Sequence, residues 1–172
     1  MNRCRSLLLG SLLLASKIGY AADPFLGRWE LDVAHSHYTP GACPKHMTIE
    51  MTQAGDGVHY HSETELQSGR SFTADYTAAY NGVPVMVTGA KSILLPVALH
   101  RESARVVVAS YTSGAETRAV SRRIVAQDGR TMTVTTTSRD GTGHEVKNVG
   151  VYRRSAAPHG LPNLLTELQP PH

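Results

Sequence analysis

The sequence predicts an all-β protein, an antiparallel up-and-down meander β-barrel of eight to ten strands. From residue 46 onward, apolar and polar side chains alternate with a period of two, which places one set in a core and the other in water. Glycine-containing turns separate these runs at short intervals, as tight hairpins require. We expect the meander to close into a barrel, because closure removes the strand edges that a sandwich leaves exposed.

The first half of the chain carries the clearest alternation. Met47, Ile49 and Met51 alternate with threonine and glutamate, and Tyr76 and Tyr80 continue a similar run farther along. Turn residues at 54–57, 68–69 and 81–82 separate the runs. Strands are therefore expected at 27–32, 46–53, 57–66, 70–80 and 83–88.

The second half repeats the pattern with more threonine. Met132 and Val134 lie among threonines, and turns are expected at 113–114, 128–129 and 140–141. Pro84 and Pro96 fall inside expected strands, which predicts bulges or sheet-edge positions there. The remaining strands are expected at 92–101, 104–112, 116–126, 130–138 and 144–154.

The N-terminus has the order of residues that is typical of an export signal. Arg3 and Arg5 precede an apolar run at 7–15, and small residues follow. The run is too short to span a membrane, so we expect cleavage near Ala21 or Ala22 and a periplasmic or secreted protein with no membrane span. The expected organisation is a signal peptide at 1–21, a barrel at 22–155 and a proline-rich tail at 156–172.

Removing the signal peptide changes the charge balance. The whole chain has 17 Lys and Arg against 14 Asp and Glu, and the loss of Arg3, Arg5 and Lys17 leaves 14 basic residues against 14 acidic ones. A basic surface for nucleic acid is therefore not expected. Cys4 lies in the signal, so Cys43 is expected to be unpaired and, beside Pro44, to have no catalytic role.

The start of the barrel resembles a known group of proteins. The run DPFLGRWELD at 23–32 contains Gly27-x-Trp29 at the entry to the first strand, and Ser36, Tyr38 and 121–123 extend the likeness. Over about 23–154 the chain resembles exported bacterial lipocalin-like proteins of the calycin superfamily, a mostly uncharacterised group. It has no disulfide pair and no clear long helix, which leaves open a fatty-acid-binding-like geometry.

The resemblance implies a structural role for Trp29. In such barrels an indole closes one end, and an arginine from a late strand stacks on its face. Arg122 and Arg123 are the expected partners here, with Arg153 as an alternative. Together with Trp29 they would form the barrel plug.

Inward-facing polar groups are the candidates for ligand binding, because a small barrel can hold one small molecule. Tyr60, Tyr76, Tyr80 and Arg101 share the parity of the apolar core residues in their strands. A tyrosine on that face supplies an apolar ring and a hydroxyl that needs a partner. The alternatives are core tyrosines satisfied by their neighbours, and an Arg101 that reaches solvent.

Two histidine pairs have the spacing that puts both imidazoles on one face of a strand. His59 and His61 alternate with apolar residues, so they are expected to point outward into solvent. His35 and His37 follow the first strand, near a barrel mouth. We expect no metal site, and the weak alternative is a metal site at these two histidines. No nucleophile elbow, phosphate loop or dinucleotide fingerprint occurs. No cofactor is expected, and the catalytic residues of any enzyme remain unknown.

Three functions fit this sequence. The first is an exported lipocalin-like protein that binds or carries a small, largely apolar molecule inside its barrel. The alternative is a barrel enzyme, an isomerase, cyclase or hydrolase acting on a hydrophobic substrate. The third is a filled structural barrel of the cell envelope. The volume and lining of the barrel interior would distinguish them.

Overall fold

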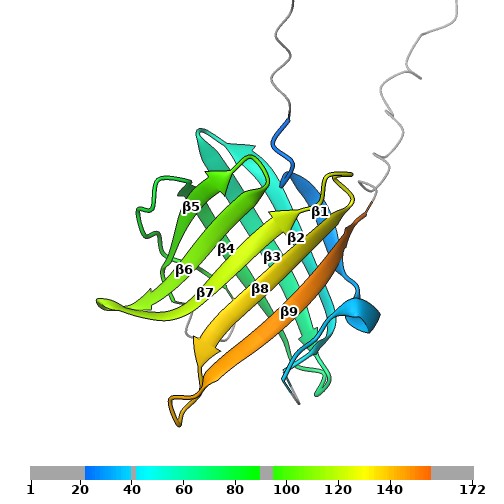
Figure 1. Ribbon diagram of the computed structural model, residues 1–172, viewed down its shortest axis with the longest axis vertical. Helices are drawn as coiled ribbons and strands as arrows, with labels where there is room; N and C mark the ends of the chain where they lie inside the picture. The colour runs from blue at the N-terminus through cyan, green and yellow to red at the C-terminus, as the bar shows by residue number, and fades with distance from the viewer. Residues whose placement is uncertain (1–21, 40–41, 90–94, 156–172) are drawn as a thin grey trace, which may run out of the picture.

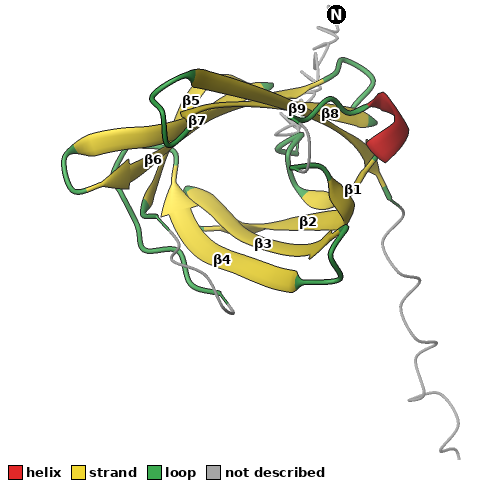
Figure 2. Ribbon diagram, turned by 90° about the horizontal axis from the view of Figure 1, so that it is seen from below, coloured by secondary structure: helices red, strands yellow, loops and turns green. Residues whose placement is uncertain are grey.

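A computed structural model describes residues 22–39, 42–89 and 95–155 of the chain. They form nine antiparallel strands and one short 3₁₀ helix, wrapped into a nearly closed barrel (Figures 1 and 2). The all-β meander and the expected strand number are confirmed. The elements are β1 (Gly27–Leu31), η1 (Val33–His35), β2 (Pro44–Ala54), β3 (Gly57–Leu66), β4 (Ser71–Ala79), β5 (Val97–Ser103), β6 (Val106–Ser113), β7 (Glu116–Val125), β8 (Thr131–Arg139) and β9 (Glu145–Arg154).

The strand order is β4-β3-β2-β1-β9-β8-β7-β6-β5. Every neighbouring pair is also a neighbour in sequence, except β1 and β9, which join the two ends of the described meander. The edge strands β4 and β5 approach each other at the remaining gap. A twisted sheet of this size closes on itself in this way because closure leaves few unpaired edges.

The expected strand at 83–88 is wrong. This segment crosses the gap between β4 and β5 and makes single bridges to each edge, Thr88 with Asp75 and Val85 with Val97. Pro84 has no N–H to donate, which disfavours a continuous ladder beside Val85. Pro96 lies immediately before β5, so the strand expected at 92–101 begins later, at Val97.

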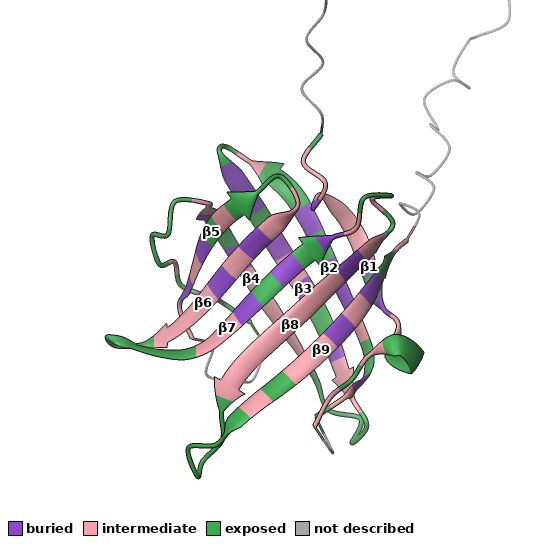
Figure 3. Cartoon of the chain, in the orientation of Figure 1, coloured by how far each residue is buried: buried purple, intermediate pink, exposed green. Residues whose placement is uncertain are grey.

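Buried and more exposed positions alternate along the strands, as expected (Figure 3), and most of the buried positions are apolar. In β2 and β3 the buried residues Ile49, Met51, Val58 and Tyr60 lie on the inner face of the paired strands, and exposed residues separate them. Apolar burial of this kind is the main stabilising contribution of the fold. The largest fully buried side chains are Trp29, Phe25, Met51, Leu99, Met132, Val58, Val97, Val107 and Val125.

One end of the barrel is closed by the segment that precedes β1. Phe25 is 1% exposed and Trp29 is 0% exposed, and the indole N–H donates to the Phe25 carbonyl at 2.9 Å. The segment 22–26 lies beside the β2–β3 and β5–β6 turns. We call this the closed end, and the end with the β3–β4, β6–β7 and β8–β9 turns the open end. Both ends of the described chain lie at the closed end (Figure 1).

The expected signal peptide at 1–21 and the tail at 156–172 lie outside the described residues, so both stay predictions. Among the described residues, no helix has the length and apolar character needed to cross a membrane.

Candidate functional site

The interior of the barrel contains a cavity near the open end. Its volume is about 280 Å³, close to the lower end of the range for small-molecule sites. The side chains of the described residues therefore do not fill the barrel interior throughout. Its lining residues are Tyr38, Ala42, Pro44, Met47, Ile49, Tyr60, Thr64, Leu66, Phe72, Tyr111, Ser121, Arg123, Val134, Thr136, Asn148, Gly150 and Tyr152.

The cavity has one apolar wall and one polar wall. Strands β2 to β4 face β7 to β9 across the barrel (Figure 2). The first group contributes Met47, Ile49, Leu66 and Phe72, which form the apolar wall. Such a wall favours burial of an apolar surface.

The polar wall is a row of three side chains in register. Ser121 of β7 pairs with Thr136 of β8, which in turn pairs with Asn148 of β9. The Ser121 and Thr136 hydroxyls lie 2.6 Å apart, and the Asn148 side-chain oxygen accepts a hydrogen bond from the Thr39 N–H at 2.8 Å. These contacts fix the orientation of the row along one side of the cavity.

Arg123 contributes a buried positive charge to the cavity wall. It is 4% exposed, and its guanidinium lies 4.9 Å from the centre of the Tyr60 ring. It donates to the Tyr111 hydroxyl at 3.2 Å. The described residues that line the cavity include no aspartate, glutamate, histidine or cysteine. The charge of Arg123 therefore has only neutral polar groups and aromatic faces around it in this wall.

Tyr60 and Tyr76, two of the predicted ligand-contacting residues, lie together at this site. Their rings stack with centroids 4.6 Å apart, and of the two residues Tyr60 lines the cavity. Burial raises the pKa of both phenols, so both are neutral at physiological pH. The Arg123 charge acts on the buried Tyr76 hydroxyl, but no described residue makes a well-formed hydrogen bond to it.

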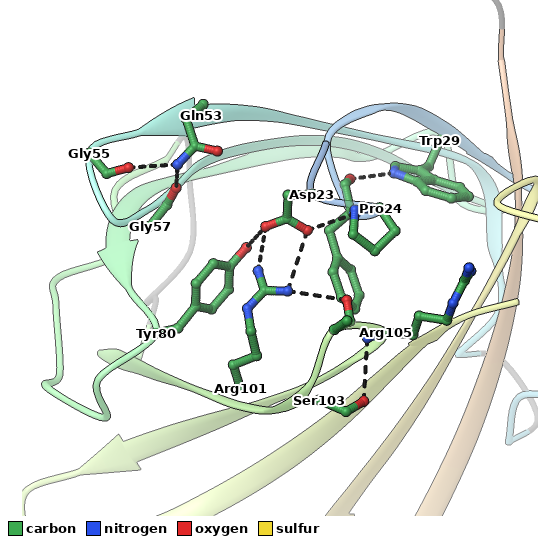
Figure 4. A network of polar contacts seen from close by, with 12 residues as sticks. Asp23, Pro24, Trp29, Gln53, Gly55, Gly57, Tyr80, Arg101, Ser103 and Arg105 are labelled. Carbon is green, nitrogen blue, oxygen red and sulfur yellow. Dashed lines mark hydrogen bonds and ion pairs between the residues drawn. The ribbon is translucent and has the colours of Figure 1, made fainter. Parts of the chain in front are cut away.

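Tyr80 and Arg101, the other two predicted residues, lie outside this cavity at the closed end (Figure 4). The Arg101 guanidinium forms an ion pair with Asp23 and lies 3.9 Å from the Tyr80 ring centre. The Tyr80 hydroxyl donates to Asp23 at 3.2 Å. Burial and the Asp23 carboxylate raise the pKa of Tyr80 to about 12. These residues thus hold the N-terminal segment in place, and Arg101 does not simply reach solvent.

A wider hollow of about 700 Å³ lies on the outer side of this plug. It borders Asp23, Tyr80 and Arg101, together with turn residues such as Gln53 and Asp56. Two of its three charged groups, Asp23 and Arg101, already pair with each other. We therefore place the candidate site in the inner cavity, where buried polar groups lack partners.

The arginine on the plug differs from the expected ones. Arg154 stacks on Trp29, with its guanidinium 4.2 Å from the ring centre. Arg122 faces outward and pairs with Glu102 at 3.0 Å, while Arg123 lies over Tyr60 in the cavity wall. The expectation that Arg122 or Arg123 would complete the plug is therefore wrong.

The alternative partner for Trp29, Arg153, also lies elsewhere. Arg153 faces outward and pairs with Asp32 at 3.1 Å. In β9 the plug position belongs to Arg154, because Arg154 lies in register with Trp29 and Arg153 with Glu30. The two neighbouring arginines thus point to opposite faces of the strand.

The histidine pairs lie on the outside of the barrel. The His59 and His61 rings bond to Thr77 at 3.1 Å and Asp75 at 2.7 Å on the outer face. His35 bonds to Asp32 at 2.8 Å, and His37 is exposed. Within the described ranges, no group of three histidine, cysteine, aspartate or glutamate side chains has a geometry that could hold a metal ion.

Several lining residues were not among those expected from the sequence. The sequence predicts Arg123 at the plug, and it does not single out Tyr111 or Asn148. Ser121, Arg123 and Val125 alternate along β7, which was the available signal, but Val120, Arg122 and Ile124 alternate equally well. Cys43 is unpaired and partly buried, close to the open end, with its thiol 3.5 Å from the Pro44 carbonyl.

Comparison with known proteins adds little beyond this geometry. No protein-family model matches the sequence, and no curated protein matches it. Among solved structures, the chain is similar to a crystal structure of zebrafish ileal bile acid-binding protein complexed with cholic acid. The identity is 12%, the match covers 77% of this chain and 99% of that chain, and the TM-score is 0.49.

Proposed function

We propose that this protein binds a small, largely apolar molecule in the cavity of its barrel. The observation that carries the proposal is an interior cavity of about 280 Å³ with an apolar wall on one side and a short polar row on the other. Burial of apolar surface would supply most of the affinity, at about 25 cal/mol per Å². Among the described lining residues no carboxylate, imidazole or thiol is present to act as a general base, which supports binding over catalysis.

A series of linear alkan-1-ols of increasing length tests the proposal without invoking charge. Each methylene buried contributes about 0.8 kcal/mol, which is about a fourfold gain in affinity. We expect the affinity to rise by about this factor per methylene and then stop rising when the cavity is full. Displacement of a fluorescent apolar dye would measure the series. Absence of binding at every length would overturn the proposal.

A pair of substitutions on β8 locates the site. Val134 lines the cavity, whereas its neighbour Thr135 faces outward between Arg122 and Val149. Val134→Phe should shorten the longest alkanol that gains affinity, because the larger ring occupies the cavity. Thr135→Phe adds a similar ring to the outer face and should leave the series unchanged. Equal effects of the two would place the binding outside the barrel.

We also propose that the protein is exported, as in the bacterial lipocalin-like group that it resembles, and that residues 1–21 are removed. The charge and apolar order of this segment supports the proposal. Intact mass spectrometry of protein recovered from the periplasm or medium of a bacterial host should give a chain that begins at Ala22 or Asp23. Recovery of only full-length protein, in the cytoplasm, would contradict it.

A further inference from the structure

We infer that the cavity selects ligands with a single anionic oxygen group, a carboxylate, which pairs with Arg123. This inference rests on the proposed function and specifies its ligand class. Arg123 is only 4% exposed, and a buried guanidinium is costly unless an anion or several hydrogen-bond acceptors compensate it. Arg123 has five N–H donors to satisfy.

The partners that surround Arg123 do not neutralise it. The guanidinium lies over the Tyr60 ring at 4.9 Å, donates to the Tyr111 hydroxyl at 3.2 Å and also interacts with the Tyr76 hydroxyl. In register it lies between Val107 of β6 and Val134 of β8. None of these groups carries a negative charge, and no ion pair joins Arg123 to a carboxylate in the described part of the chain. The missing acceptor is therefore expected to enter with the ligand.

Two further polar atoms near the cavity lack well-formed hydrogen bonds. Thr64, a residue that lines the cavity, is 4% exposed and its hydroxyl is buried, and Tyr76, whose ring stacks on Tyr60, is 5% exposed and also has a buried hydroxyl. Neither has a hydrogen-bond partner of good geometry among the described residues. Buried hydroxyls without partners are uncommon in proteins. The interior is thus built with more hydrogen-bonding capacity than the protein itself satisfies.

The number of cations favours a carboxylate over a more highly charged group. Arg123 is the only Lys, Arg or His among the described residues that line the cavity. A planar guanidinium matches the two oxygens of a carboxylate in a bidentate pair. A phosphate dianion would leave charge uncompensated in a site with one cation. The apolar remainder of the ligand would lie against the wall formed by Met47, Ile49, Leu66 and Phe72.

Matched ligands of one chain length test this inference. Affinities of decanoate, decan-1-ol and methyl decanoate would be measured by dye displacement at neutral pH for the full protein. We expect decanoate to bind about tenfold or more tightly than the two neutral ligands, since a charge-assisted pair exceeds a neutral hydrogen bond. Equal affinities for all three would overturn the carboxylate inference and leave the proposed function standing. No binding of any of them would count against the proposed function itself.

Variants of the two adjacent arginines assign the effect to the cavity. Arg123→Met should abolish the preference for decanoate while decan-1-ol still binds, and Arg123→Lys should retain part of it. Arg122→Met removes the neighbouring charge, which faces outward toward Glu102, and should leave the preference unchanged. A preference that survives Arg123→Met, or that Arg122→Met removes, would contradict the inference.

A measurement on the unaltered protein tests the inference even where the variants fail to fold. Decanoate labelled with carbon-13 at its carboxyl group reports its own ionisation in the complex by NMR. A nearby guanidinium favours the charged form, so the carboxyl pKa in the complex should lie below that of free decanoate. A carboxyl pKa raised in the complex would mean burial without an ion pair, and would overturn the inference.

Discussion

Gly27 explains in a single residue why glycine precedes tryptophan at the start of the barrel. Its φ is 116°, and a Cβ at this position would lie 2.6 Å from the Arg154 guanidinium. That guanidinium donates to the Leu26 and Pro24 carbonyls and stacks on Trp29. The absent side chain therefore gives Arg154 access to the plug, in addition to allowing the backbone conformation.

Gly27→Ala should destabilise the protein for both reasons. The positive φ alone costs about 1–3 kcal/mol for a residue with a side chain, and displacement of Arg154 adds to this loss. Gly55→Ala is the matched control, because Gly55 has a φ of 54° and a Cβ added there would meet no atom within 4 Å. Urea unfolding followed by the fluorescence of the single tryptophan would measure both variants. Equal losses would show that the Arg154 contact contributes nothing.

His61 makes a pH-dependent contribution to stability on the outer face. Its hydrogen bond to Asp75, 2.7 Å long, raises the pKa of the imidazole above its ordinary value of about 6.5. The folded state thus favours the protonated ring. The stabilising ion pair is fully present below the ordinary pKa and is lost as the pH rises through the higher folded-state pKa.

His61→Gln should therefore destabilise the protein at pH 5 and have a smaller effect at pH 8. His59→Gln is the control, since the His59 ring bonds to the Thr77 hydroxyl at 3.1 Å and not to a carboxylate. Free energies of unfolding at several pH values would give the comparison. A loss for His61→Gln that stays constant across this range, or grows toward pH 8, would contradict the assigned ion pair.

Among the contacts between strands, those that close the barrel between β4 and β5 are the weakest. Within the described ranges no continuous ladder joins these two edges, and isolated bridges from the segment 80–89 connect them instead. The Thr88 N–H donates to the Asp75 carbonyl at 2.8 Å, and the Asp75 N–H donates back at 2.7 Å. Few hydrogen bonds at an edge imply local opening at a lower free energy than elsewhere in the sheet.

Thr88→Pro removes one of these two donors and should make the Asp75 amide exchange its hydrogen faster. Thr88→Ala keeps the backbone N–H and is the matched control. Hydrogen exchange followed by NMR would compare Asp75 with an amide in the continuous ladder between β7 and β8. Unchanged exchange at Asp75 in the proline variant would mean that the bridge does not hold the edge closed.

Strand β7 shows where the hydropathy pattern of one element was insufficient. Its inward residues include Ser121 and Arg123, both 4% exposed, while Ile124 points outward and is 37% exposed. Hydropathy alone would place Ser121 and Arg123 on the outer face and Ile124 on the inner face. The register of β7 with β6 and β8 decides which of its side chains point into the barrel. Local preference is overridden at functional sites more often than elsewhere, which agrees with the placement of Arg123 in the cavity.

Along the barrel axis, the whole molecule has well-paired polar groups at its closed end and poorly paired ones at the cavity. The closed end holds Phe25, Trp29 and the paired charges of Asp23 and Arg101. The cavity side holds the uncompensated charge of Arg123 and hydroxyls without well-formed hydrogen bonds. If the cavity binds a ligand as proposed, these groups without good partners lower the stability of the ligand-free protein.

Arg123→Met should therefore raise the free energy of unfolding of the ligand-free protein by about 1–4 kcal/mol, because it replaces a poorly compensated buried charge with an apolar side chain. The same substitution is expected to remove the preference for carboxylates. Arg122→Met should change stability by less than about 0.5 kcal/mol, as is usual for an exposed position. Thermal and urea unfolding of both variants would test this. A strong loss of stability in Arg123→Met would show that Arg123 supports the fold.

Local sequence patterns are enough to predict the fold class of this barrel. Alternation over β2, β3 and β4 and the glycine turns between strands are local patterns, and local geometry fixes which side chains share a face. The plug at Trp29 was expected from the resemblance of the Gly27-x-Trp29 run to lipocalin-like proteins, and not from local geometry. The parity of Tyr60 and Tyr76 likewise placed both rings inside.

Which residues meet across the barrel depends on the tertiary structure and cannot be predicted from local patterns. Arg154, and neither Arg122 nor Arg123, reaches Trp29 because β9 pairs with β1. Tyr80 and Arg101 have the expected parity but lie at the closed end, where Asp23 occupies them. Strand tilt and register set the height of each side chain in a barrel, and neither can be read from the spacing of residues within one strand.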